Sequence, residues 1–248
     1  MSEEIEQKLL KEIEELKNKV AKLENIEHST KPIYQYSKIK DSDLDNLVMI
    51  EKRFDNSVFD SWLNQENLLE DEEENKLFFQ NIIDRNQRLI NDYNEEDLKV
   101  NVIIPILNRV EFKSFENEFR DFYELPLRYE TDNFIFKGTT DFVVSKGLVK
   151  SKKPYFFIQE FKRGEEYGNP RPQLLAELIT GVELNGWREM KGAYIIGAIW
   201  YFVILYKVDK DSYEYFVSNS FDSMNLVQLI DIYNNLLFVK NEIKLALE

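Results

Sequence analysis

The sequence predicts an α/β fold with a mixed central sheet, and three observations support this class. From Asn94 onward, helical periodicity alternates with strand-like runs in the order helix, three strands, helix, two or three strands, helix. The strand-like runs are rich in β-branched and aromatic residues, which favour strands. With 43% hydrophobic residues over 248 positions, the chain can also bury a sizeable core.

The start of the chain carries a heptad pattern. Its apolar residues are spaced 4, 3, 4, 3 among glutamates and lysines, at Leu9, Ile13, Leu16, Val20 and Leu23. This pattern predicts a helix over residues 3–26 with one apolar stripe. Two interpretations stay open, because the stripe could pack on its own chain or pair with a second copy or another protein as a coiled coil.

Residues 31–93 are predicted to form a helical region. Apolar periodicity indicates helices around residues 43–63 and 75–93, and the acidic run EDEEEN between them is expected to be a solvated connection. The sequence therefore predicts three parts: a heptad helix over 1–30, a helical region over 31–93 and an α/β domain over 94–248.

The α/β domain is predicted to begin with an amphipathic helix in EEDLKVNVIIPILNRV. One face of this helix is apolar and consists of Leu98, Val102, Ile103, Ile106, Leu107 and Val110. Pro105 lacks the N–H that would continue the helical hydrogen bonding, so we expect a local kink there.

Strands and further helices are predicted to follow. ELPLRYETDNFIFKGTTDFVV contains two strands joined near residues 131–133, PYFFIQEFK a third, and PQLLAELITGVEL a helix. GAYIIGAIWYFVILYKV is almost continuously hydrophobic, but its β-branched and aromatic residues favour strands over a membrane span. YEYFVSNSF is expected to add a short edge strand, and a closing helix follows from MNLVQLIDIYNNLL onward.

Composition excludes several kinds of function. The chain has no cysteine, which rules out disulfides, thiolate metal sites and a cysteine nucleophile. Its one histidine, His28, lies in a polar stretch where a solvated surface imidazole is expected. A net charge of -14 argues against generic coating of nucleic acid. The charged start of the chain and the lack of a long apolar segment predict a cytoplasmic protein without a membrane span.

Buried charges in the third strand of the α/β domain indicate a site. In FFIQEFKRG, Glu160 and Lys162 alternate with apolar residues, although desolvating an unpaired charge costs several kcal/mol. Strand alternation places the two on one face. Asp141 interrupts the apolar run of the neighbouring strand. Two carboxylates from adjacent strands suit a hard, oxygen-seeking cation such as Mg²⁺, which would explain why the charges are there.

This arrangement resembles the signature of the PD-(D/E)XK nuclease superfamily, an Asp on one strand of a hairpin and Glu-x-Lys on the next. Here the signature would run from GTTD, ending at Asp141, to QEFK, ending at Lys162, with Thr140 where the superfamily has proline. The resemblance covers about residues 94–220 and implies a restriction-endonuclease-like αβββαβ core. The wider pattern looks like bacterial nuclease-fold proteins related to the N-terminal regions of restriction enzymes, which implies a restriction, defence or mobile-element context.

The resemblance implies a Mg²⁺-dependent deoxyribonuclease, a phosphodiester hydrolase for which Mn²⁺ is an expected substitute metal. Asp141 and Glu160 would bind the metal, and the carbonyl of Phe161 would add a ligand. Lys162 would assist the nucleophilic water. DNA is thus the expected partner, with its strandedness, the cleavage of RNA and the sequence read all left open.

The flanking helices are expected to supply further site residues by the same resemblance. Glu95 is the preferred match to an acid on the preceding helix, where it would hold a second metal ion or a water, and Glu96 and Asp97 are its rivals. Gln173 fits a glutamine on the following helix that orients the lysine or a phosphate, with Glu177 one turn later.

The Glu-x-Lys triplet alone is weak evidence, because it recurs along the chain. The copy Glu111-Phe112-Lys113 directly follows a helix and has no strand-borne aspartate before it. An alternative interpretation is a buried ion triad in a nuclease-like fold that no longer cuts, so that the protein acts in assembly or nucleic-acid binding through its N-terminal coiled coil.

Overall fold

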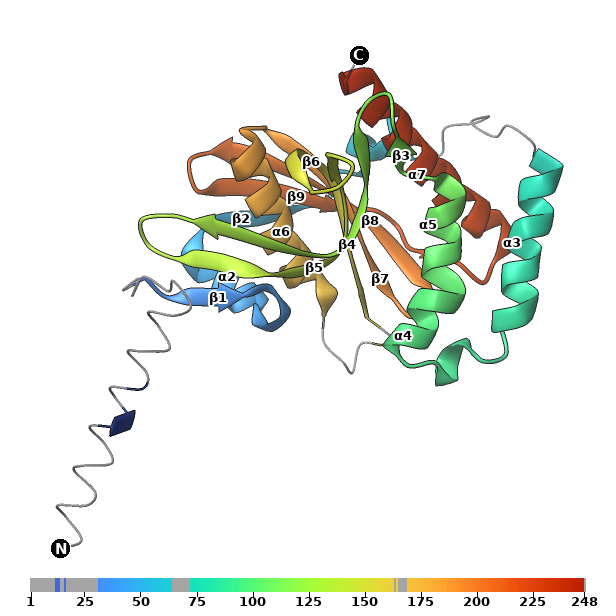
Figure 1. Ribbon diagram of the computed structural model, residues 1–248, viewed down its shortest axis with the longest axis horizontal. Helices are drawn as coiled ribbons and strands as arrows, with labels where there is room; N and C mark the ends of the chain where they lie inside the picture. The colour runs from blue at the N-terminus through green and yellow to red at the C-terminus, as the bar shows by residue number, and fades with distance from the viewer. Residues whose placement is uncertain are drawn as a thin grey trace, which may run out of the picture.

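The computed structural model describes residues 12–13, 16, 31–63, 72–162, 164 and 169–247 and has an α/β architecture built on one ten-stranded sheet (Figure 1). Across the sheet the strands run in the order β2 (Met49–Arg53), β9 (Ser212–Val217), β8 (Ile199–Asp209), β7 (Glu189–Ile196), β6 (Lys152–Lys162), β5 (Ile135–Lys146), β4 (Phe119–Glu130) and β3 (Lys113–Ser114). Two short strands lie off this path, β1 (Ile33–Gln35) beside β5 and β10 (Phe221–Asp222) beside β8.

The polarity of the sheet is mixed, as the sequence predicted. β4, β5 and β6 form an antiparallel meander, and β7, β8 and β9 form a second one. The two meanders join through parallel pairing of β6 with β7. A parallel pair needs a crossover, and helix α6 (Pro170–Asn185) provides it.

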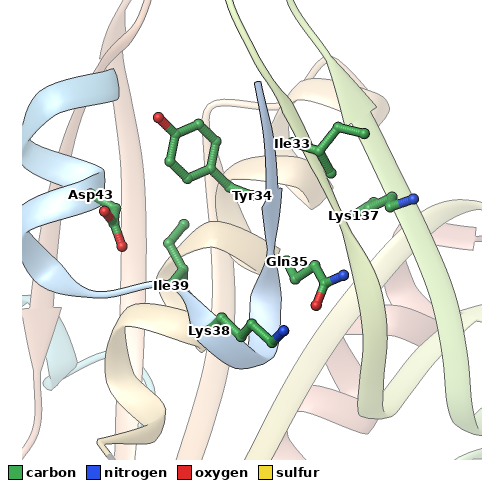
Figure 2. Close-up of a pocket in the computed structure, with 7 residues that line it drawn as sticks. All are labelled: Ile33, Tyr34, Gln35, Lys38, Ile39, Asp43 and Lys137. Atoms are coloured by element: carbon green, nitrogen blue, oxygen red, sulfur yellow. The ribbon is translucent and has the colours of Figure 1, made fainter. Parts of the chain in front are cut away.

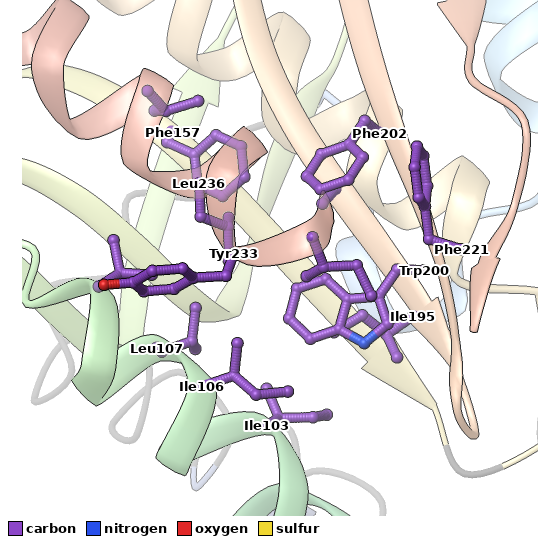
Figure 3. Close-up of a cluster of buried hydrophobic side chains, with 14 of the residues drawn as sticks. Ile103, Ile106, Leu107, Phe157, Ile195, Trp200, Phe202, Phe221, Tyr233 and Leu236 are labelled. Atoms are coloured by element: carbon purple, nitrogen blue, oxygen red, sulfur yellow. The ribbon is translucent and has the colours of Figure 1, made fainter. Parts of the chain in front are cut away.

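Helices cover both faces of the sheet (Figure 1). α3 (Glu72–Asn86), α5 (Ile104–Val110) and α7 (Leu226–Leu247) gather on one face, while α6 and α2 (Asp41–Leu47) lie on the other. Each face has its own apolar core. In the core beneath α5 and α7, Ile106 and Leu107 of α5 meet Trp200 of β8 and Leu236 of α7 (Figure 3).

The first helix of the predicted α/β domain is interrupted at the expected place. It consists of α4 (Glu95–Leu98), a π-helical turn η4 (Lys99–Ile103) and α5, and all six residues of its predicted apolar face are buried. Pro105 cannot donate to the carbonyl of Asn101, which instead accepts a hydrogen bond from the side chain of Asn86 at 3.2 Å. The proline therefore produces a wider helical turn whose freed carbonyl is satisfied by a neighbour.

The predicted strands and helices that follow are confirmed, with one correction. Residues 131–134 connect β4 to β5, and the hydrophobic run GAYIIGAIWYFVILYKV forms β7 and β8. YEYFVSNSF contains β9, which was expected to be an edge strand. That expectation was wrong, because β2 pairs in parallel with β9 and takes the edge.

Residues 31–93 are less helical than the sequence indicated. α3 occupies the second predicted helix, but the stretch 43–63 holds the end of α2, strand β2 and a 3-10 turn η2 (Asn56–Phe59). Four of the five residues of β2 are exposed, so this edge strand lacks the apolar alternation by which a strand is recognised. β1 and β2 both join the sheet, and the domain boundary at residue 94 stays a prediction.

The heptad helix predicted for residues 3–26 falls almost wholly outside the described residues, which include only Glu12, Ile13 and Leu16 of it. Its pairing therefore stays a prediction. Among the helices that the structure does describe, none has the combination of length and apolar character that crossing a membrane requires.

Candidate functional site

The predicted carboxylates meet where β5 and β6 separate. The ladder between the two strands ends at the pair Phe142 and Gln159. One residue further, side chains replace the backbone bonds: the N–H of Asp141 donates to Oε1 of Glu160 at 3.0 Å, and the N–H of Phe161 donates to Oδ2 of Asp141 at 3.1 Å. This reciprocal pair of hydrogen bonds fixes both carboxylates at the gap between the strands.

A close approach of α6 adds a third carboxyl group. Gly192 of β7 makes the approach possible, because a Cβ there would lie 2.8 Å from the carbonyl oxygen of Ile158 and 3.0 Å from Leu178 of α6. Glu177 of α6 and Glu160 of β6 are both fully buried and interact with each other. Among the described residues, no other N–H or O–H group donates a hydrogen bond to the Oε2 atom of either glutamate.

Two buried carboxyl groups in contact resist ionising together. Burial raises the pKa of Glu160 well above its usual range, and the neighbouring Glu177 and Asp141 raise it further. Burial also raises the pKa of Glu177 well above its usual range, although hydrogen bonds from Glu160 and Gln173 act in the opposite direction. In the metal-free protein the pair therefore retains a proton at pH values where an exposed glutamate has lost it.

Lys162 lies at the open side of this cluster. Its ammonium is 3.7 Å from Oε1 of Glu95 and donates to the carbonyl of Phe161 at 3.3 Å. Burial raises the pKa of the Glu95 carboxyl, and the attraction of Lys162 partly offsets this. The first turn of α4 thus brings Glu95 to the lysine of the predicted signature.

The two rivals of Glu95 are placed differently. Asp97 closes a capping box with Asn94, accepting from its N–H at 3.3 Å while its own N–H donates to the Asn94 side chain at 2.9 Å. The side chain of Glu96 is 77% exposed and lies 3.9 Å from the ammonium of Lys99. Glu95 is therefore the acid of this turn that faces Lys162.

Gln173 reaches the cluster but makes a different contact from the one expected. Its amide nitrogen donates to Oε1 of Glu177 at 3.2 Å, so it orients a carboxyl group of its own helix where an interaction with Lys162 or a phosphate was anticipated. Gln173 and Glu177 are four residues apart on one helix, and this spacing in the sequence already indicated that their side chains can meet.

Lys99 is a member of the cluster that sequence reasoning missed. Only 9% of the residue is exposed, and its ammonium donates to Oε1 of Glu124 at 2.8 Å and lies 5.0 Å from the centre of the Phe161 ring. The available signal was again a spacing of four, because Glu95 and Lys99 must share a face of any helix that begins at Asn94.

The donor set suits a hard cation. No N–H group of the described residues donates to the buried Oε2 of Glu160, and Asp141 lies directly across the gap, so two carboxylates could share an ion. Mg²⁺ keeps several waters and is often held by only one or two protein carboxylates. Across the described residues, no three His, Cys, Asp or Glu side chains already converge as a complete metal cage.

A pocket of about 380 Å³ is separate from this cluster. Figure 2 shows its lining from β1, the following 3-10 turn and β5, including Tyr34, Lys38 and Lys137. Lys137 precedes Asp141 by four residues, which is about 13 Å along a strand. The pocket therefore adds no side chain to the carboxylate cluster.

No family model matches the chain, and no curated protein matches it either. The side chains of the site are therefore the basis for inferring its chemistry.

Proposed function

We propose that the protein is a divalent-metal-dependent nuclease that hydrolyses phosphodiester bonds of DNA. The observation that carries the proposal is the gap between β5 and β6, where Asp141 and Glu160 face each other with Lys162 beside them. Two carboxylates and a lysine at one strand gap suit metal-assisted attack of water on a phosphate.

The order of elements also supports the resemblance to PD-(D/E)XK nucleases. Apart from the two-residue strand β3, which lies between them, a helix (α4 to α5) precedes three antiparallel strands (β4, β5 and β6). Helix α6 then leads to β7, which is parallel to β6. This order corresponds to the αβββαβ arrangement that the resemblance implies, and the acidic and lysine side chains stand on the second and third of the three strands.

Asp141 and Glu160 would hold Mg²⁺, which when bound neutralises carboxylate charge and lowers the pKa of a coordinated water. Lys162 can stabilise the negative charge that develops on the phosphate oxygens in the transition state. Glu95 keeps the ammonium of Lys162 close to the site. Hydrolysis joins the water oxygen to phosphorus, breaks one phosphorus–oxygen ester bond and leaves a proton on the departing oxygen.

A group of exposed lysines away from the site suits an anionic substrate, despite the net charge of -14. Lys150, Lys152 and Lys153 are exposed at the β5–β6 hairpin, at the opposite end of β6 from Glu160. Phosphates favour such a local cationic surface. DNA contacts at this hairpin would add to binding without taking part in the chemistry.

The test is cleavage of plasmid and single-stranded DNA by the purified protein with Mg²⁺, with Mn²⁺ and with a chelator. We expect metal-dependent cleavage, and Asp141→Ala should reduce its rate by a factor on the order of 10² or more. Asp132→Ala is the matched control, because it removes an exposed carboxylate from the turn between β4 and β5.

Calorimetry separates the metal site from the chemistry. Wild type and Asp132→Ala should bind Mg²⁺ or Mn²⁺ alike, while Asp141→Ala should bind far more weakly. Equal binding by Asp141→Ala would remove the metal assignment. Normal metal binding without cleavage of any tested DNA would instead favour the alternative of a nuclease-like module that does not cut.

A further inference from the structure

Lys99 is a buried cation that the proposed chemistry leaves without a role. Its side chain is 11% exposed, whereas the side chains of Lys162, Glu95 and Glu124 are 21%, 41% and 60% exposed. It begins the π-helical turn η4, a rare element that is often found at functional sites. Burying an ammonium is costly unless it is paired, so its partners show what holds it there.

The main partner of Lys99 is held in an unfavourable backbone conformation. Glu124 has a φ of 50° in the middle of β4, a left-handed conformation that is unfavourable for a residue with a Cβ. The β4–β5 ladder skips this position, although the register is continuous on both sides of it. The local break is where the Glu124 carboxylate reaches Lys99, at 2.8 Å.

Two partners of Lys99, Glu124 and Phe161, are also neighbours of Asp141. Glu124 is the register neighbour of Asp141, since Tyr123 pairs with Phe142 and Leu125 with Thr140. Phe161, whose ring lies beneath Lys99, donates its N–H to Asp141. Burial lowers the pKa of Lys99, but the bond with Glu124 and the attraction of Asp141 together outweigh it, so the side chain stays charged.

We infer that Lys99 provides a fixed positive charge near Asp141 that substitutes for the charge of a second metal ion, so that this site binds one divalent cation. This inference rests on the proposed function. In two-metal sites the ions lie about 3.5–4 Å apart and share carboxylates. Here Glu124 is paired with Lys99 and Glu95 with Lys162, and Glu177 of α6 accepts a hydrogen bond from Gln173. The carboxylates held at the gap between β5 and β6 are then Asp141 and Glu160, which we assign to a single ion.

The inference gives Glu95 a different role from the one expected from the sequence. The sequence suggested that Glu95 would hold a second ion or a water, whereas its nearest charged partner in the structure is Lys162. A second divalent ion between Glu95 and Asp141 would have to approach both ammonium groups. Lys99 acts through the charge of Asp141, so it is a positioning residue and not a group that touches the reacting atoms.

The first test is the number of Mn²⁺ ions bound by the wild-type protein. Calorimetric titration should give one ion per chain, and the electron paramagnetic resonance spectrum should show isolated Mn²⁺ without coupling to a second ion. Two ions per chain at the site, with a coupled spectrum that Asp141→Ala removes, would overturn the inference. Absence of any bound ion would instead count against the proposed function.

Variants of Lys99 then test its charge. Lys99→Met should bind a second Mn²⁺ or bind the first at least tenfold more tightly, whereas Lys99→Arg should keep one ion with wild-type affinity. Lys113→Met is the matched control, an exposed lysine in the other Glu-Phe-Lys triplet. Wild-type stoichiometry and affinity in folded Lys99→Met would overturn the role of Lys99. If circular dichroism shows that Lys99→Met is unfolded, the same comparison is made with Lys99→Gln.

Discussion

The two copies of Glu-Phe-Lys in this chain have the same letters and opposite environments. Glu111 ends α5 in a left-handed conformation with a φ of 57° and is exposed, and Lys113 stands exposed on the short edge strand β3. Glu160 is fully buried in the centre of the sheet, and Lys162 is held between Glu95 and the carbonyl of Phe161.

What the two copies share is their phenylalanine. The ring of Phe112 stacks on that of Phe157 at a centroid distance of 6.2 Å, and Phe112 and Phe161 are both buried in the same core. The flanking charges differ because one copy ends at solvent and the other faces the carboxyl groups of a neighbouring strand and helix. Whether a Glu-Phe-Lys triplet can form a functional site therefore depends on which groups the fold places opposite its charged side chains.

The largest effect should be common to both copies. Phe112→Ala and Phe161→Ala should each lower the free energy of unfolding by about 3–5 kcal/mol, because each leaves a cavity in a packed core. Urea denaturation measures both values. A cost for Phe112→Ala below 1 kcal/mol would show that the first copy contributes nothing to the core, which would break the similarity between the two.

The next effect should separate the copies. Glu160→Ala should reduce DNA cleavage by a factor on the order of 10² or more, while Glu111→Ala should leave it near the wild-type rate. Lys162→Ala and Lys113→Ala form a second matched pair, in which the first should lower the rate more than it weakens metal binding. The comparison would be reversed by an inactive Lys113→Ala together with an active Lys162→Ala.

Periodicity predicted much of the fold because buried elements leave regular patterns. The apolar face that includes Leu98 and Val110 and the central strands β4 to β8 were all recognisable in this way. Strand β2 was not, because an edge strand with four exposed residues carries no such pattern. The parallel pairing of β2 with β9 is a long-range contact for which no local signal exists.

The candidate site was predictable to a similar extent. Asp141 and Glu160 interrupt buried strands, and a charged residue in a buried strand is unusual enough to identify both from the sequence. In the structure, reciprocal hydrogen bonds join them. Lys99 lies next to the apolar face of its helix, but the sequence led to no prediction for it. Its burial depends on the π-helical turn and on the left-handed backbone at Glu124, which no sequence spacing encodes.

A smaller effect should appear in the pH dependence of stability without metal. The folded pKa of Glu177 lies above the usual 4.5, so as pH rises past 4.5 the unfolded chain loses a proton that the native pair retains. The free energy of unfolding should therefore fall with pH until the folded pKa is passed, by about 1.4 kcal/mol per pH unit for one retained proton.

Glu177→Gln isolates this contribution from the other carboxylates of the chain. The variant removes one of the two acids and offers an amide donor to Glu160, so its stability should fall less steeply between pH 5 and pH 8 in the presence of a chelator. Denaturation curves at several pH values supply the difference between the two proteins. Parallel pH profiles would show that the glutamate pair does not retain a proton.

The smallest effect belongs to the backbone of the first copy. Glu111 follows the last turn of α5 with a φ of 57°, a conformation that glycine adopts without the steric cost borne by a residue with a Cβ. Glu111→Gly should raise the free energy of unfolding by about 0.5–1 kcal/mol, because the relieved strain exceeds the added flexibility of the unfolded chain. Metal binding and cleavage should not change, since Glu111 faces solvent. Loss of stability in Glu111→Gly would mean that the Glu111 side chain has a structural role. The glutamate of the first copy would then contribute to the fold, and the contrast with Glu160 would be weaker.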